Sequence, residues 1–238
     1  MDVPRRRPAR AHIAGILALL VLGAGVLGGP GGGLAETPLP PERLRDSGLA
    51  AWDEGRYLLA HQRLAQYLAR EPAAPDRRAV EEKLAQARAA LLGTAARRSL
   101  LLVTTEEQSP AGGVSLVRLA ARDGRVTLEA STGSRPRTPT WQRAGLVGPE
   151  AYTRLVGEVL DAPAFRVHLP IQAFDPNLPG PRRAVTVRLV IGDETWEAAA
   201  LRGEPYERLT ELAARVQDFA RATPVTPEGG ASSGERRP

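Results

Sequence analysis

Residues 185–201 read VTVRLVIGDETWEAAAL, and this stretch decides the fold class. Apolar side chains occupy every second position from 185 to 191, which is the period of a half-buried strand. Gly192-Asp193 then supplies a two-residue turn, because glycine adopts a positive φ without strain. Residues 194–201 return from that turn, so the stretch predicts an antiparallel hairpin.

More strands precede this hairpin. Residues 100–103 form an apolar run typical of a buried strand, and residues 114–119 form another strand. Asp123-Gly124 is a second turn signal, and residues 126–130 follow it with alternating polarity. The pattern predicts a second hairpin.

The intervening segments predict loops and helices. Residues 131–147 are polar and hold two prolines, which indicates a loop. Pro149 and Pro205 each open a helix, since the φ of proline suits the first helical turn. Residues 165–169 predict a short strand, and residues 170–183, with four prolines, predict a loop.

The order of these elements predicts the fold class α+β. Five to six strands and two helices fit an antiparallel sheet with both helices packed on one face. We expect this domain to span residues 98–222.

A helical module over residues 42–95 comes before the sheet. The expected helices cover residues 42–54 and 56–70, and a third helix carries an apolar stripe that Gly93 is expected to end. Small and apolar residues recur at spaced positions before a proline: Gly48, Ala51, Ala60, Leu64, Tyr67 and Pro72.

In these positions, and in the turn Gly55-x-Tyr57-x-x-Ala60, residues 42–92 resemble a single tetratricopeptide (TPR) repeat with a capping helix. Leu44 stands at the family's leading tryptophan position, which is a departure. Such repeats usually stack in threes to bury a core, so the resemblance implies that this one docks on the sheet domain or on another chain. The module is therefore either a packing hairpin or a partner-binding face.

The element order over residues 114–220 is similar to that of emfourin-type inhibitors of metalloproteases. The helix, Phe165, the loop, the hairpin and the last helix follow one another in that family's order, and the long loop 170–183 departs from it. The similarity implies that an exposed loop contacts a protease, and it assigns no inhibitory residue.

Residues 1–35 predict an export signal. Arg5, Arg6, Arg7 and Arg10 precede an uncharged apolar run at 13–27, and Gly33-Leu34-Ala35 gives the small-x-small pattern of a signal peptidase site. The alternative is an uncleaved membrane anchor over residues 12–35. We therefore expect a periplasmic or extracellular protein, or one anchored in the inner membrane of a bacterium.

Residues 36–41 are a proline-rich linker, and residues 223–238 predict a disordered tail because they hold almost no large apolar residue. The chain has no cysteine, so an exported fold rests on core packing alone. The first 35 residues hold four of the 32 basic residues and one of the 27 acidic ones, which leaves the rest nearly neutral. This balance argues against nucleic-acid binding.

The sequence holds no recognisable catalytic motif. After the signal only His61 and His168 remain, and neither has a second ligand at metal-binding spacing. We expect no enzyme activity, no cofactor and no metal. The candidate residues for partner contact are Trp141, Trp52 and Tyr57, since exposed aromatic side chains often anchor interfaces. For Trp52 and Trp141 the alternative is a place in the core.

These observations predict a non-catalytic exported protein of the cell envelope that acts through protein–protein interaction. A secreted protease inhibitor and a small-ligand binder are the alternatives.

Overall fold

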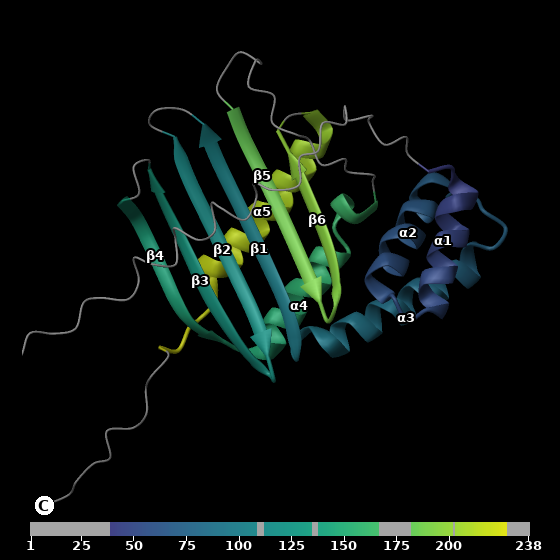
Figure 1. Ribbon diagram of the computed structural model, residues 1–238, viewed down its shortest axis with the longest axis horizontal. Helices are drawn as coiled ribbons and strands as arrows, with labels where there is room; N and C mark the ends of the chain where they lie inside the picture. Colours follow the sequence, from purple (N-terminus) through teal and green to yellow (C-terminus); the bar gives the residue numbers. More distant parts are fainter. Residues whose placement is uncertain (1–38, 109–111, 135–137, 167–181, 202, 228–238) are drawn as a thin grey trace, which may run out of the picture. The chain divides into compact units, whose positions relative to one another are not determined.

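The computed structural model describes residues 39–108, 112–134, 138–166, 182–201 and 203–227. The elements in chain order are α1 (Pro41–Asp53), α2 (Tyr57–Arg70), α3 (Arg77–Ala95), β1 (Arg98–Gln108), β2 (Gly113–Arg122), β3 (Arg125–Ser134), β4 (Thr138–Val147), α4 (Pro149–Leu160), the 3-10 helix η1 (Pro163–Arg166), β5 (Arg182–Ile191), β6 (Glu194–Ala200) and α5 (Gly203–Ala222) (Figure 1). The predicted export signal, His168 and residues 170–181 of the predicted loop 170–183 lie outside the described residues.

The strands form one six-stranded antiparallel sheet in the order β4-β3-β2-β1-β5-β6. This sheet and its helices confirm the predicted α+β class. The β5–β6 hairpin closes where Ile191 pairs with Glu194, and Gly192 in its turn has a φ of 62°. In the β2–β3 turn Asp123 and Gly124 both have positive φ, 51° and 80°. The Asp-Gly and Gly-Asp signals therefore mark real turns.

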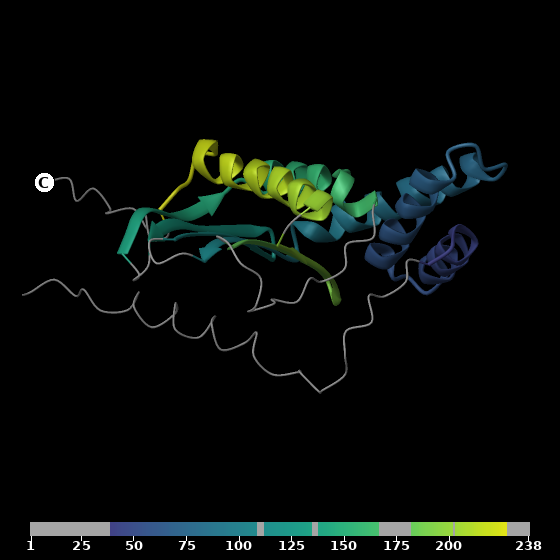
Figure 2. The same ribbon diagram turned by 90° about the horizontal axis from the view of Figure 1, so that it is seen from above.

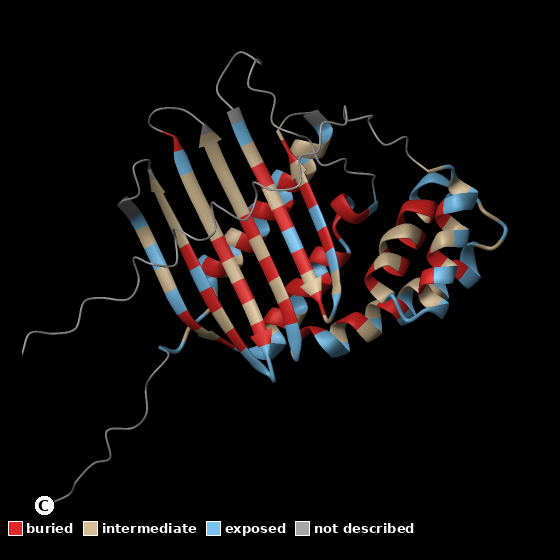
Figure 3. Ribbon diagram, viewed as in Figure 1, coloured by how far each residue is buried: buried red, intermediate tan, exposed pale blue. Residues whose placement is uncertain are grey.

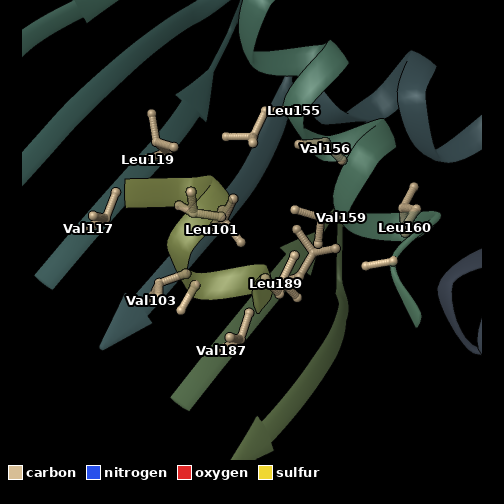
Figure 4. Close-up of a cluster of buried hydrophobic side chains, with 14 of the residues drawn as sticks. Leu101, Val103, Val117, Leu119, Leu155, Val156, Val159, Leu160, Val187 and Leu189 are labelled. Carbon is tan, nitrogen blue, oxygen red and sulfur yellow. The ribbon is translucent and has the colours of Figure 1, made fainter. Parts of the chain in front are cut away.

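Helices α4 and α5 lie on the same side of the sheet (Figure 2). Buried residues alternate with partly exposed ones along the strands, as expected when helices cover one face (Figure 3). Leu101, Val117 and Leu189 of three strands lie in one cluster with Leu155 and Val159 of α4 (Figure 4). This aliphatic layer is the main core of the chain.

The predicted loop over residues 131–147 is wrong. Strand β3 continues to Ser134, and β4 (Thr138–Val147) pairs with β3 as the edge of the sheet. An edge strand tolerates Pro139, because one side of its backbone needs no ladder hydrogen bond. The register shifts between Thr132 and Gly133, where the pairing is irregular.

Three other boundaries differ from expectation. Phe165 lies in η1 and not in a strand, while residues 167–169 lie outside the described part. Strand β5 already begins at Arg182, inside the predicted loop. Helix α3 passes through Gly93 and ends at Ala95, because its last turn packs into the main core through Leu91 and Ala95.

The first residues of the predicted tail pair with the sheet. The Leu146 N–H donates to the Thr226 carbonyl at 2.8 Å, and the Thr226 N–H donates to the Leu146 carbonyl at 3.0 Å. Residues 228–238 lie outside the described part.

The three helices of the helical module pack through small residues. A Cβ atom at Gly48 would lie 2.6 Å from Leu64 Cδ2, so glycine permits this approach of α1 to α2. One buried cluster contains an alanine from each helix: Ala51 of α1, Ala60 of α2 and Ala87 of α3. A second cluster contains Leu44, Leu64, Tyr67 and Val80.

The end of the helical module joins the sheet through backbone hydrogen bonds. The carbonyls of Ala96 and Arg97 accept from Gly124 and Asp123, and the carbonyl of Arg98 accepts from Gly192. Residues 96–98, where α3 leads into β1, are thus bonded to the turns of both hairpins. Leu58 of α2, with Leu91 and Ala95 of α3, belongs to the main core cluster of the sheet domain.

Candidate functional site

The amino end of α2 is bound by a side chain of the sheet. Glu194, the first residue of β6, accepts the Leu58 N–H on Oε1 at 3.0 Å and the Leu59 N–H on Oε2 at 3.1 Å. The residue at the N-cap position, Arg56, makes no side-chain capping bond. A carboxylate here satisfies two free N–H groups and complements the positive end of the helix dipole.

An aromatic stack continues this joint along α2. The His61 ring meets the Phe165 ring edge-on with centroids 6.0 Å apart, and Phe165 stacks on Trp196 at 4.1 Å. His61 is only 3% exposed, and its Nδ1 has no hydrogen-bond partner. Burial lowers the pKa of His61 to about 4, so it is neutral at pH 7 and acts as a packing residue.

Helix α3 is tied to the end of α4 by a bidentate ion pair. Arg88 Nε donates to Asp161 Oδ1 at 2.9 Å, and its Nη2 donates to Oδ2 at 2.6 Å. Asp161 is the residue that follows α4. Helices α2 and α3 therefore both contact the sheet domain, whereas α1 packs mainly on α2 and α3.

Two of the three predicted contact residues lie in one cluster. Trp52 at the end of α1 and Tyr57 at the start of α2 are half-buried, and both pack against the alanine cluster of the helical module. Tyr57 also packs against the main core, so it belongs partly to the joint with the sheet. Trp141 lies on β4, half-buried against the main core, and the structure does not bring it to the other two.

Trp52 has a charged partner that sequence reasoning missed. The ammonium of Lys83, on α3, lies 3.2 Å from the centroid of the Trp52 ring. Such a cation over an indole face is attracted by the ring quadrupole. Lys83 is the only lysine of the chain, and that was the one signal in the sequence that could have drawn attention to it.

These residues define a surface that we call the Trp52 face. It comprises Trp52 and Lys83. Leu49, one turn before Trp52 on α1, is half-buried against the second cluster of the module and borders this surface. The face belongs to α1 and α3, while the Glu194 contact and the aromatic stack both engage α2. The Trp52 face is the part of the helical module that these contacts leave available.

Tyr152 is a second buried titratable side chain in the described part of the chain. Burial raises the pKa of Tyr152 to about 12, and its hydroxyl lies 2.7 Å from Ser99 Oγ. Among the residues that the structure describes, no group of three His, Cys, Asp or Glu side chains could hold a metal ion. In that same part of the chain, no helix has the length and apolar character needed to span a membrane.

No protein-family model, no curated protein and no solved structure matches this chain.

Proposed function

We propose that this chain is a non-catalytic protein of the cell envelope, exported by residues 1–35, and that it binds a protein partner through the Trp52 face. The observation that carries the proposal is that the helices which bind the sheet domain leave the Trp52 face on another side of the module. Contacts of α2 and α3 fasten the module to the sheet domain, whereas Trp52, with Lys83 beside it, lies at the end of α1 with part of its ring exposed and its Nε1 buried without a hydrogen-bond partner.

The Trp52 face offers a side chain of a type that often binds other proteins. Tryptophan is among the residue types that most often dominate the binding energy of interfaces. An indole offers a large apolar area at a small cost in side-chain entropy, and the ammonium of Lys83 adds one positive charge beside it. We expect the partner to present an apolar side chain next to a carboxylate.

The resemblance to one TPR repeat supports the same proposal. A single repeat lacks the neighbours that would bury its second side. Here the sheet domain covers the α2 side through Leu58 and the aromatic stack. The module can therefore remain folded as one repeat while its other side meets a partner.

A capture experiment with matched variants tests this proposal. The tagged chain is purified from gently crosslinked cells as wild type, Trp52→Ala and Trp141→Ala, and the proteins that accompany it are compared. We expect one stoichiometric partner that is lost with Trp52→Ala and kept with Trp141→Ala, because Trp141 lies on β4. Equal recovery with all three forms would place the binding surface elsewhere.

The identity of the captured protein separates the alternatives. A protease would support the inhibitor proposal drawn from the element order of residues 114–220. The same preparation yields the N-terminal residue of the mature chain. A chain that begins at Glu36 supports the cleaved signal, and one that retains residues 1–35 in the membrane fraction supports the anchor.

A further inference from the structure

One end of the helix-covered sheet face carries hydroxyls where the main core carries aliphatic side chains. Along β1 the buried Val103 is followed two residues later by the half-buried Thr105. Thr105 pairs with Ser115 of β2, and Ser115 pairs with Thr132 of β3. Neighbouring strands lie about 4.8 Å apart, so the three hydroxyl-bearing residues form a row across adjacent strands. We call it the hydroxyl row.

Helix α5 forms a wall beside this row. The amide Nε2 of Gln217 donates to Ser115 Oγ at 3.1 Å and reaches Thr105 Oγ1 at 3.5 Å. Tyr206, Ala213 and Ala214 of α5 line the same space, which is a groove of about 420 Å³. This size falls in the range of small-molecule sites.

The groove is polar on its floor and mainly apolar on its wall. The methyl groups of Ala213 and Ala214 and the half-buried Tyr206 face a floor that contains Thr105, Ser115 and Thr132. The charges at its mouth compensate each other, since Arg183 Nη2 lies 3.6 Å from Glu107 Oε1. Glu106 also lines the groove, but it alternates with Thr105 and so belongs to the opposite sheet face.

These properties restrict the class of ligand. Gln217 and Thr140 already bond the hydroxyl row, but each hydroxyl can make further hydrogen bonds. A wholly apolar ligand would remove that remaining capacity from water without satisfying it, which costs free energy. A charged ligand would find no uncompensated countercharge among the described lining residues. A ligand with hydroxyl groups along one edge and a face of carbon atoms can hydrogen-bond to the floor of the groove and pack against its wall.

We propose that the groove binds a neutral sugar ring, with its hydroxyls on Thr105, Ser115, Thr132 and Gln217 and its carbon face against Tyr206, Ala213 and Ala214. This binding function is separate from the partner contact at the Trp52 face, because the described residues that line the groove lie on the sheet and α5. A ligand of one ring is small, so its Kd should be on the order of 1 mM.

The test uses the full chain labelled with ¹⁵N and two probes, glucose and N-acetylglucosamine, with the dipeptide Ala-Ala as comparison. Backbone amide shifts are followed by NMR during titration up to about 20 mM, well above the expected Kd. We expect saturable shifts at Thr105, Ser115, Thr132 and Gln217 with at least one of the sugars.

Two variants on exposed positions of α5 separate the groove from the rest of the protein. Ala214→Phe places a ring in the groove without touching the hydroxyl row, and we expect at least a tenfold loss of affinity. Ala222→Phe, at the end of the same helix and outside the groove lining, should leave the affinity unchanged. Thr132→Val, which removes one hydroxyl and keeps the shape, should weaken binding several-fold.

The proposal is overturned if neither sugar gives saturable shifts in the titrated range, or if the dipeptide alone does. It is also overturned if Ala214→Phe and Ala222→Phe bind a sugar equally well, because the bound site would then lie outside the groove.

Discussion

Glu194 and Leu58 are joined by a hydrogen bond of 3.0 Å although 136 residues separate them in the chain. The bond places the carboxylate of β6 at the amino end of α2, where free N–H groups and the helix dipole both favour negative charge. Glu194 thus accepts hydrogen bonds from the first turn of α2, as an N-cap side chain does in other helices. It therefore couples the start of α2 to the first residue of β6.

Loss of the Glu194 carboxylate should destabilise the protein. We expect Glu194→Ala to lower the free energy of unfolding by about 1–2 kcal/mol, the usual loss for a helix cap, and Glu194→Gln to have an intermediate effect. Urea unfolding of the full chain measures both. Glu197→Ala is the matched control on the same strand, since its ion pair with Arg188 is long, at 3.8 Å, and exposed. Equal losses at 194 and 197 would contradict the capping role.

His61 should make the protein acid-sensitive. Its pKa is about 4 in the folded protein against an ordinary value of 6.5, so the unfolded state binds more protons between these pH values. The stability that neutral His61 provides is complete above pH 6.5 and is lost as the pH falls toward 4. The loss should amount to roughly 3 kcal/mol at pH 4.

A variant isolates this effect from the titration of carboxylates. His61→Phe keeps an aromatic ring against Phe165 and removes the titrating group. Denaturant unfolding at pH 7 and pH 4.5 should show a smaller decrease for His61→Phe than for the wild type. Parallel decreases for the two proteins would mean that His61 is not held neutral in the joint.

Two glycines in helices should respond oppositely to alanine. A Cβ at position 48 meets the buried Leu64 at 2.6 Å, so Gly48→Ala should cost about 1–3 kcal/mol of stability despite the better helix propensity. A Cβ at position 93 meets nothing within 4 Å inside α3, so Gly93→Ala should stabilise by up to about 1 kcal/mol. Thermal unfolding reports both. A destabilised Gly93→Ala would indicate that the helix ends there, as the sequence alone suggests.

Arg143 should hold the carboxyl end of α5 to β4. Its guanidinium donates to the carbonyls of Ala220 at 3.0 Å, Thr223 at 2.7 Å and Arg221. We expect Arg143→Met to cost about 1–3 kcal/mol, because these acceptors lose a charged donor. Amide hydrogen exchange at Thr226 should also accelerate, since its bonds to Leu146 follow directly after the clamped segment. Unchanged exchange would show that the Thr226 pairing stands without Arg143.

The elements that sequence reasoning predicted well are those with a local signal. Gly192 and Asp123-Gly124 predict their turns correctly, because the backbone at these residues adopts a positive φ. Strand β4 was missed because its pattern is polar and contains Pro139, and only pairing along the edge of β3 makes it a strand. The prediction that α3 ends at Gly93 is wrong for a similar reason. Leu91 and Ala95 pack in the main core, so the helix continues beyond a residue type that often ends helices.

The candidate surfaces were predicted only in part. Trp52 and Tyr57 follow from residue type and lie together, but Lys83 reaches Trp52 from another helix, which no short-range pattern reveals. The hydroxyl row has no sequence signature either. Thr105, Ser115 and Thr132 are ordinary strand residues until the strand registers align them.

The central claim is that the Trp52 face is the partner-binding surface, and site-specific crosslinking tests it most directly. The chain has no cysteine, so Asp53→Cys introduces a single thiol beside Trp52 for a photo-crosslinker, and Glu211→Cys on α5 serves as the control. In living cells we expect one discrete adduct from position 53, which disappears when Trp52→Ala is added, and none from position 211. An absence of adducts from position 53, or an adduct that survives Trp52→Ala, would contradict the account.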